Sequence, residues 1–311
     1  MSDSLHVSRV LQQQRDSEQR NSHERKHNET EIRRLPGTGT PTVSIVIPAR
    51  NEAKNLEQVL PTLPAVHEVI LVDGASSDGT VETAQRVMPK IRVIHQTRRG
   101  KGNALACGFS AATGDIIVMF DADGSADPAE IASYVAALTD GADFAKGTRF
   151  SPGGGSEDIT RLRQAGNLAL NAITNLLFRA RYSDLCYGYN AFWRRVLPHL
   201  DLPDVRLPER PDGKMRWGDG FEIETILSCR ITAAKMIVAE VPSVERSRIY
   251  GASNLNAVTD GLRVLKSILT EHRRARSANA GARFTTRRRP AVLRRVSVGR
   301  IAEIAERSEA A

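Results

Sequence analysis

The sequence predicts an α/β domain in which a mostly parallel central sheet carries helices on both faces. Two observations lead to this fold class. Short apolar runs alternate with helical stretches four times between residues 43 and 138, and this alternation is typical of parallel sheets. The runs are apolar throughout, as are strands that are covered on both faces. A chain of 311 residues that is 41% apolar also excludes collagen-like and wholly disordered proteins.

The first half of the chain supplies the four repeats in order. We expect strands at Val43–Ile47, Glu68–Val72, Ile91–His95 and Asp115–Phe120. A helix follows each strand, at Glu52–Leu60, Asp78–Val87, Lys101–Thr113 and Pro128–Leu138. The carboxylate of Asp78 is suited either to capping its helix or to accepting hydrogen bonds from a ligand.

The second half is less regular. We expect strands at Asp143–Lys146 and Met236–Val241, a polar loop at Arg206–Trp217, and helices at Thr160–Phe178, Asp219–Arg230 and Asn254–Glu271. One side of the last helix carries Leu255, Val258, Leu262, Leu265, Ile268 and Leu269. An apolar face of this kind packs on the folded body or lies on a bilayer surface.

Charge divides the chain more clearly than composition does. The net charge is +8, and residues 271–311 alone hold 11 basic and 4 acidic side chains. We expect a disordered or loosely helical leader at 1–40, a folded domain at 41–254, an amphipathic helix at 255–275 and a basic, disordered tail at 276–311. The tail is interpreted first as solvated, next as a contact for an anionic membrane, and last as a nucleic-acid arm.

Cysteine usage and hydropathy indicate where the protein works. Cys107, Cys186 and Cys229 are far apart and lack CxxC spacing, which favours a reducing compartment without disulfides. The N-terminal region has no apolar segment typical of a secretory signal. No apolar run reaches the roughly 18 residues that span a bilayer. We therefore expect a cytoplasmic protein without a transmembrane segment, able to bind peripherally at the inner face of the cell membrane.

The ends of the predicted strands carry the candidate chemistry, because ligands of such sheets bind there. No GxGxxG follows the first strand, which counts against a dinucleotide oxidoreductase. The fourth strand ends in Asp121-Ala122-Asp123. Two carboxylates at the end of a buried strand need a cation nearby. Their oxygens suit Mg²⁺ or Mn²⁺ carrying a diphosphate, so we predict that Asp121 and Asp123 bind the metal.

Four motifs in a fixed order now indicate a family: SIVIPARNE, ILVDGASSDGT, RRGKGNALACGF and IIVMFDADGS. The chain resembles the family 2 glycosyltransferases of GT-A fold, a nucleotide-diphospho-sugar transferase fold, and among them the dolichol-phosphate or polyprenyl-phosphate mannose synthase branch. KGTRFSPGGGS, SDLCYGYNAFWRRVL, FEIE and VPSVERSRIYGAS extend the resemblance to residue 255. It implies a metal-dependent, inverting transferase that moves mannose or glucose from GDP-mannose or UDP-glucose to a polyprenyl phosphate.

The resemblance also implies roles for individual residues. It assigns the nucleotide-sugar site to Pro48, Asn51, Glu52, Asp73, Lys101, Asp121, Ala122 and Asp123. It makes Asp121, Asp123 and Glu224 catalytic, and it makes Arg149, Arg248 and Ser253 ligands of the acceptor phosphate. Simpler interpretations stay open, since Lys101 fits a solvated loop and Glu224 or Arg248 fits an ion pair.

The nature of the acceptor separates the rival functions. A phosphate monoester is already anionic at neutral pH and needs no strong base, whereas a hydroxyl needs one, for which Asp219, Glu222 and Glu224 are the candidates. The alternative function is therefore transfer to a hydroxyl of a soluble secondary metabolite or cell-wall precursor. A remote alternative is a nucleic-acid-binding protein with a degenerate transferase body. Residues 41–270 hold 26 basic and 26 acidic side chains, so we expect no nucleic-acid partner.

Overall fold

The structure, a computed structural model, describes residues 39–251, 257–281 and 293–295. Contacts within the chain separate Met1–Thr40 from Pro41–Ala311, and the fold below belongs to the second unit. The expected leader, Ser253, Leu255 and most of the expected tail lie outside the described residues.

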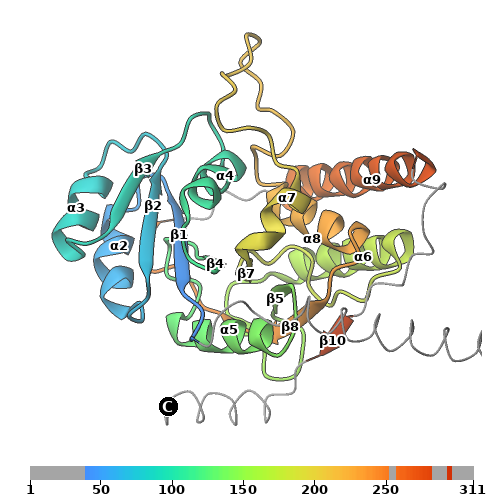
Figure 1. The fold of residues 1–311 in the computed structure, drawn as a ribbon, viewed down its shortest axis with the longest axis horizontal. Coiled ribbons are helices and arrows are strands. Elements are labelled where there is room, and N and C mark those ends of the chain that lie inside the picture. Colours follow the sequence, from blue (N-terminus) through green and yellow to red (C-terminus); the bar gives the residue numbers. More distant parts are fainter. Residues whose placement is uncertain (1–38, 252–256, 282–292, 296–311) are drawn as a thin grey trace, which may run out of the picture. The chain divides into compact units, whose positions relative to one another are not determined.

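A mixed sheet of eight strands forms the centre of the described part of this unit (Figure 1). Its strands, in spatial order, are β10 (Leu293–Arg295), β8 (Val238–Pro242), β5 (Phe144–Thr148), β7 (Asn190–Trp193), β4 (Ile116–Met119), β1 (Val43–Ala49), β2 (Glu68–Asp73) and β3 (Arg92–His95). Only β7 runs antiparallel to its two neighbours among these strands. The prediction of a mostly parallel sheet is therefore confirmed.

Helices cover the sheet. They are α2 (Ala53–Val59), α3 (Thr80–Val87), α4 (Lys101–Ala111), α5 (Ile131–Thr139), α6 (Arg161–Phe178), α7 (Leu197–Leu200), α8 (Ile223–Ala233) and α9 (Ala257–Gly281), with 3₁₀ turns at Leu60–Thr62, Pro128–Glu130 and Arg194–Val196. In Figure 1, α4 and the pair α2–α3 flank β1, β2 and β3 from opposite sides. Helix α5 packs on β5, β7 and β8. A second, two-stranded sheet pairs β6 (Gly155–Ser156) with β9 (Val244–Glu245).

The core lies between the strands and these helices. Ile45, Val46 and Ile47 of β1 are completely buried, as expected for a strand that is covered on both faces. Gly108 explains how α4 approaches so closely, because a Cβ at this position would lie 2.2 Å from Cγ1 of Val46. This contact fixes α4 against the sheet and brings its first residue, Lys101, above the carboxyl end of the sheet.

The antiparallel strand β7 is the main element that the sequence pattern did not predict. It inserts between β4 and β5 and pairs Asn190 with Met119. An antiparallel strand starts at the edge where its parallel neighbours end. The segment Cys186–Tyr189 that precedes β7 is thereby brought beside the end of β4, where Asp121 lies.

Two helix boundaries differ from the expected ones. Helix α8 begins at Ile223 rather than Asp219, because the Asp219 carbonyl accepts from the Gly102 and Asn103 amides at the start of α4 rather than from the Ile223 amide. Helix α9 runs to Gly281, past the expected boundary at 275.

Helix α9 packs on α6 and α8 through Val264, Leu265 and Ile268. Packing on the body, one of the two expected roles for its apolar face, is therefore confirmed. Leu262 and Leu269 do not share that contact and remain exposed. No helix in the described ranges is both long enough and apolar enough to cross a bilayer.

Candidate active site

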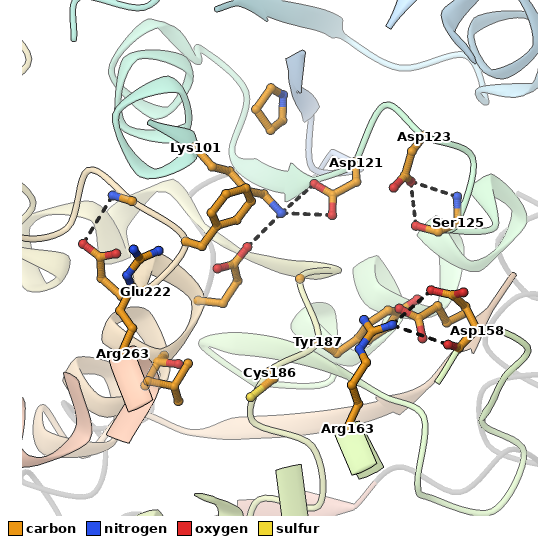
Figure 2. Close-up of a pocket in the computed structure, with 18 of the residues that line it drawn as sticks. Lys101, Asp121, Asp123, Ser125, Asp158, Arg163, Cys186, Tyr187, Glu222 and Arg263 are labelled. Atoms are coloured by element: carbon orange, nitrogen blue, oxygen red, sulfur yellow. Dashed lines mark hydrogen bonds and ion pairs between the residues drawn. The ribbon is translucent and has the colours of Figure 1, made fainter. Parts of the chain in front are cut away.

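A pocket of about 770 Å³ opens at the carboxyl ends of β1 and β4, where ligands of doubly wound sheets bind. Its donor end, as we call it, is formed by the segments after β1 and β4 and by the start of α4. Its opposite end, which we call the acceptor end, is formed by α6, the segment before β7, the start of α8 and the start of α9. Figure 2 shows Lys101, Asp121 and Asp123 on one side of this pocket and Arg163, Cys186 and Tyr187 on the other.

Lys101 joins two of the three catalytic candidates, Asp121 and Glu224. Its Nζ lies 2.8 Å from Oδ1 of Asp121 and 2.8 Å from Oε1 of Glu224. Gly188 borders all three, since a Cβ there would lie 3.2 Å from Oδ2 of Asp121 and 3.4 Å from both other groups. The simpler interpretation of Lys101 as a solvated loop residue is wrong, because Lys101 begins α4, as expected, and its side chain is only 18% exposed.

The electrostatics of this triad follow from burial and charge. Burial alone would lower the pKa of Lys101, but the carboxylates of Asp121 and Glu224 outweigh burial and raise it. Burial raises the pKa of Asp121, and the Lys101 ammonium opposes that shift. Lys101 is therefore a permanent cation at neutral pH between two acidic groups.

A second cation occupies the other half of the D-x-D motif. Arg248 donates from one terminal nitrogen to Oδ2 of Asp123 (3.1 Å) and from the other to Glu52. The Asp123 Oδ1 atom accepts hydrogen bonds from the Ser125 backbone and hydroxyl, at 3.0 and 2.7 Å. Arg248 also donates to the Tyr250 carbonyl, and the neighbouring Ile249 amide donates to the Asp123 carbonyl at 3.1 Å, so a segment distant in sequence lies at the end of β4.

These contacts weaken the electrostatic argument for a metal ion but do not exclude a metal ion at this site. The sequence predicts that Asp121 and Asp123 need a cation, and the chain provides Lys101 and Arg248. No three histidine, cysteine or acidic side chains within the described ranges converge in a metal-binding arrangement. A Mg²⁺-like ion that carries a diphosphate needs only one or two protein carboxylates, and both lie in the same pocket. The donor set therefore fits such an ion once the cations move toward phosphate.

The predicted nucleotide-site residues divide into two groups. Pro48, Glu52, Lys101, Asp121, Ala122 and Asp123 line the pocket. Asn51 lies outside its lining, adopts φ 56° and accepts from the Ser77 backbone at 2.8 Å. Asp73 is buried behind the lining beside His95 and the Ser76 amide. Both residues join the turns after β1 and β2, so their direct contact with a nucleoside stays a prediction.

Asp78 serves the same junction. Its Oδ1 accepts from the Thr80 amide at 3.1 Å, and its Oδ2 accepts from Ala53, the first residue of α2, also at 3.1 Å. Of its two expected roles, capping is the one that the structure shows, and Asp78 satisfies orphan donors at the starts of both α2 and α3.

Lys101 is positioned by a buried anchor. The Arg98 guanidinium binds Asp219 through Nε and NH2, at 2.7 and 2.9 Å. The Asp219 carbonyl then accepts from the amides of Gly102 and Asn103 at the start of α4. A Cβ on Gly102 would lie 2.0 Å from the Gly218 carbonyl oxygen, so this close approach requires glycine. The anchor fixes the loop before α8 on the start of α4, and with it Lys101 opposite Glu224.

The predicted acceptor residues lie apart from each other. Arg149 is buried, binds Asp184 through two nitrogens at 2.7 and 3.0 Å, and binds Glu245 at 2.9 Å. Burial alone would lower the pKa of Arg149, but these carboxylates raise it. Arg248 lies at the donor end, against Asp123, and is in an ion pair as one interpretation expected. The structure thus brings Arg248, rather than Arg149, to Asp123, one of the two carboxylates predicted to bind the metal.

The three candidate bases are already engaged. Asp219 binds Arg98, and Glu222 accepts from the backbone amides of Gly218 and Gly220 at 3.1 and 3.3 Å. Glu224 binds Lys101, so its expected ion pair is with lysine rather than arginine. None of the three presents an unpartnered carboxylate to the pocket.

Several pocket residues were missed by the sequence analysis. They are Gln96, Arg99, Asp158, Arg163, Gly188, Phe221, Arg246 and Arg263. Arg163 pairs with Asp158 at 3.2 Å and Arg246 with Asp127. Arg99 carries a usable signal, because it lies next to the Gly-Lys-Gly of a recognised motif. The arginines of α6 and α9 carry none, because only folding brings these two helices to one pocket.

The fold and this pocket define an α/β transferase whose ligand site lies at the carboxyl end of a mostly parallel sheet. The glycosyl transferase family 2 model matches residues 44–200. The chain is 31% identical over 235 residues to the polyprenol monophosphomannose synthase of Mycolicibacterium smegmatis, which covers 71% of this chain and 84% of that protein. The chain therefore belongs to glycosyl transferase family 2 and is a glycosyltransferase, as the motifs predict.

Other comparisons agree on the fold. The dolichol-phosphate mannosyltransferase of Pyrococcus furiosus is 29% identical over 233 residues, which cover 70% of this chain and 60% of that protein. A glucosyl-3-phosphoglycerate synthase from Mycobacterium tuberculosis, solved with Mn²⁺, UDP and phosphoglyceric acid, superposes with a TM-score of 0.56 at 21% identity. The match covers 77% of this chain and 84% of that one, and it confirms the GT-A fold.

Proposed function

We propose that this glycosyltransferase moves a hexose from a nucleotide sugar to a polyprenyl phosphate, with inversion at the anomeric carbon and with Mg²⁺ or Mn²⁺ at Asp121 and Asp123. The observation that carries the proposal is that Asp219, Glu222 and Glu224 are all engaged. A site without an unpartnered base suits an acceptor oxygen that is already anionic, as in a phosphate monoester. The names of the two mannosyltransferase relatives support the same acceptor class.

The donor end supplies binding and charge. Asp121 and Asp123 would hold the metal through hard oxygen ligands, and Pro48, Glu52 and Ala122 line the space beside them. When bound, the ion supplies positive charge against the departing nucleoside diphosphate. Arg248, released from Asp123, and Lys101, released from Asp121 but still held by Glu224, would donate to phosphate oxygens, for which a guanidinium and an ammonium are well suited. Donor binding thus exchanges internal ion pairs for contacts to phosphate.

The acceptor end supplies orientation. Arg163 and Arg263 line it, Arg246 lines the same pocket, and so does Arg149, which is held between Asp184 and Glu245. A phosphate group at this end would sit among fixed positive charges while its oxygen attacks the anomeric carbon. Glu224 keeps Lys101 in place beside Asp121, which is a positioning role for a residue expected to be catalytic. Ser253 remains a proposed phosphate ligand.

The alternative is a soluble acceptor. The similar synthase of known structure was solved with phosphoglyceric acid, and this likeness extends only to the fold. A panel of donors tests both possibilities: GDP-mannose, UDP-glucose and UDP-N-acetylglucosamine, each offered with a short polyprenyl phosphate or with phosphoglycerate, with and without EDTA. We expect transfer only to the polyprenyl phosphate, with inversion at the anomeric carbon. We expect no product in EDTA. Transfer only to the soluble acceptor, or transfer that survives chelation, contradicts the proposal.

We also propose that the enzyme works in the cytoplasm, at the inner face of the cell membrane. The support is chemical, since a polyprenyl phosphate places its charged group at a membrane surface while its chain stays in the bilayer. Fractionation of cells that produce the full chain tests this, with the enzyme expected in the membrane fraction and released by high salt.

A further inference from the structure

Helix α6 exposes an apolar surface that the fold leaves uncovered. Between Ala165 and Leu176 every exposed residue is glycine, alanine or leucine. The large side chains of this surface are strongly exposed: Leu162 is 65% exposed, Leu168 69% and Leu176 80%. Exposed leucines are normal when single, but a continuous row of them marks a contact surface.

Helix α9 carries exposed leucines beside α6. It packs against α6, and Phe178 meets His272 with ring centroids 5.4 Å apart. Leu262 and Leu269 of α9 are exposed at 64% and 40%, one on each of two turns of the same helix face. We call Leu162, Leu168, Leu176, Leu262 and Leu269, together with the small residues between them, the α6–α9 face.

Basic residues outnumber acidic ones around the α6–α9 face, and of these Arg163 and Arg274 are paired with Asp158 and Asp201. Residues 161–181 contain four arginines and no aspartate or glutamate. From Gly261 to Ser277, five basic residues accompany a single acid, Glu271. Glu271 is buried and paired with Arg230, so it does not offset these charges at the surface. Apolar side chains rimmed by arginine and lysine are complementary to an anionic bilayer, into which leucine inserts while the cations meet lipid phosphates.

The pocket opens at the same face. Leu162, Arg163 and Gly166 of α6 line it, as do Gly261, Arg263 and Val264 at the start of α9. The acceptor end of the pocket therefore lies between the starts of the two helices that carry the exposed leucines. A lipid whose chain stays in the bilayer would reach this opening with its phosphate first.

We propose that the α6–α9 face docks the enzyme on an anionic membrane surface and so presents the pocket to lipid-phosphate acceptors. The sequence places the membrane contact on the last helix or the basic tail, whereas the buried face of α9 packs on the body. In the docking surface assigned here, α6 carries three of the five exposed leucines, and the sequence analysis expected no such role for this helix. The proposal deepens the proposed function, since it rests on a lipid acceptor.

The test measures binding of the full chain to sedimented vesicles of phosphatidylcholine alone and of phosphatidylcholine mixed with phosphatidylglycerol. We expect binding only to the anionic vesicles, weakened by salt. Replacing Leu168→Gln together with Leu176→Gln should weaken binding by about tenfold or more, because two inserting side chains are lost. The matched control is Leu207→Gln, an exposed leucine in the loop before α8, which should leave binding unchanged.

A second pair of variants guards against misfolding and tests the sign of the charge. Ala172 is exposed in the middle of the face, so Ala172→Glu and Ala172→Lys both fit without repacking. The glutamate should weaken binding to anionic vesicles more than the lysine does. Equal binding by the wild type, the leucine variants and both Ala172 variants overturns the proposal. So does loss of a dimer in the leucine variants, which would make this face an interface between copies of the chain.

Transfer to a short, water-soluble polyprenyl phosphate separates this inference from the proposed function. The leucine variants should keep that activity while they lose vesicle binding. Vesicle binding through the α6–α9 face without any transfer to polyprenyl phosphates would overturn the proposed function and leave the docking surface standing. Deleting residues 296–311, which leaves strand β10 in place, supplies the last comparison: binding that depends on this segment and not on the leucines overturns the docking surface.

Discussion

Lys101 is the residue on which most of the pocket's electrostatics depend. It forms ion pairs with Asp121 and Glu224 at once, at 2.8 Å from each. Without it, two acidic groups would face each other in a partly buried site, and Asp123 would add a third negative charge close by. Like charges at this separation favour protonation or the uptake of another cation.

A Lys101→Met variant tests this role. We expect it to lower the free energy of unfolding by about 2–4 kcal/mol, because removal of one partner leaves buried charge uncompensated. Mn²⁺ should raise the melting temperature of the variant more than that of the wild type, since the ion replaces the lost ammonium. Thermal unfolding with and without Mn²⁺ measures both effects. Lys90→Met, at an exposed position, is the control, and equal responses to Mn²⁺ would contradict the account.

Single residues of the site were predictable where a motif ends a strand. Asp121 and Asp123 follow an apolar run directly, so their place in the pocket could be predicted. Their partners could not. Arg248 lies 125 residues from Asp123, and only the path of the chain after β9 brings the two together. Because the sequence does not show that Lys101 and Arg248 lie beside Asp121 and Asp123, the two carboxylates alone indicated a metal ion. The structure shows that these two cations also supply positive charge there.

The Glu68 carboxylate, at the start of β2, accepts hydrogen bonds from three other segments of the chain. It accepts from the Ser44 hydroxyl in β1, from the Thr113 amide and hydroxyl after α4, and from Arg92 in β3. Burial alone would raise the pKa of Glu68, but these donors lower it from 4.5 to about 2. A group whose pKa is lowered by folding stabilises the protein above its unfolded pKa, and this stability is lost as the pH falls toward 2.

We therefore predict that Glu68→Gln lowers the free energy of unfolding at pH 7 by about 1–3 kcal/mol. The difference from the wild type should shrink as the pH falls from 4.5 toward 2, because protonation of Glu68 removes the same interactions. Urea titrations across that range measure it. The control is Glu57→Gln, which removes an exposed pair with Arg86. A difference that does not change with pH would show that the carboxylate charge is not responsible.

Helix α9 is held by a buried ion pair as well as by apolar contacts. The Arg230 guanidinium binds Glu271 at 2.9 and 2.8 Å, and the Trp217 indole donates to the same carboxylate at 2.9 Å. Glu271→Gln should destabilise the protein by about 2–4 kcal/mol, since Arg230 loses its counter-charge. Tryptophan fluorescence during urea unfolding reports this, because Trp217 touches the altered group. Stability within about 0.5 kcal/mol of the wild type, the range of ordinary surface substitutions, would contradict it.

Elements were predictable where the hydrophobic pattern repeats. The first four strands and their helices recur with regular spacing, and the structure has all of them within a few residues. Strand β7 breaks that regularity, because it has four residues, runs antiparallel and follows a loop rather than a helix. Helix α9 illustrates another limit, since a pattern shows that a face is apolar but not whether a neighbouring helix covers it.

For the whole described unit, the two halves of the chain contribute different parts of one pocket. The regular half supplies the donor end, with Glu52, Lys101, Asp121 and Asp123. The irregular half supplies the acceptor end and the segment that carries Arg248. The conserved geometry of parallel strands made the first part predictable. The second part depends on tertiary contacts, which is why Arg163, Arg246 and Arg263 were missed.

The central claim is that Asp121 and Asp123 bind a divalent ion together with the diphosphate of the donor. Calorimetric titration of GDP and UDP into the full chain, with Mn²⁺ or with EDTA, tests it most directly. Mn²⁺ should strengthen binding of the preferred nucleotide to the wild type by about tenfold or more, which is at least about 1.4 kcal/mol. Asp123→Asn should lose that gain, while Asp212→Asn, in an exposed pair with Arg210, should keep it. An undiminished gain in Asp123→Asn would contradict the claim.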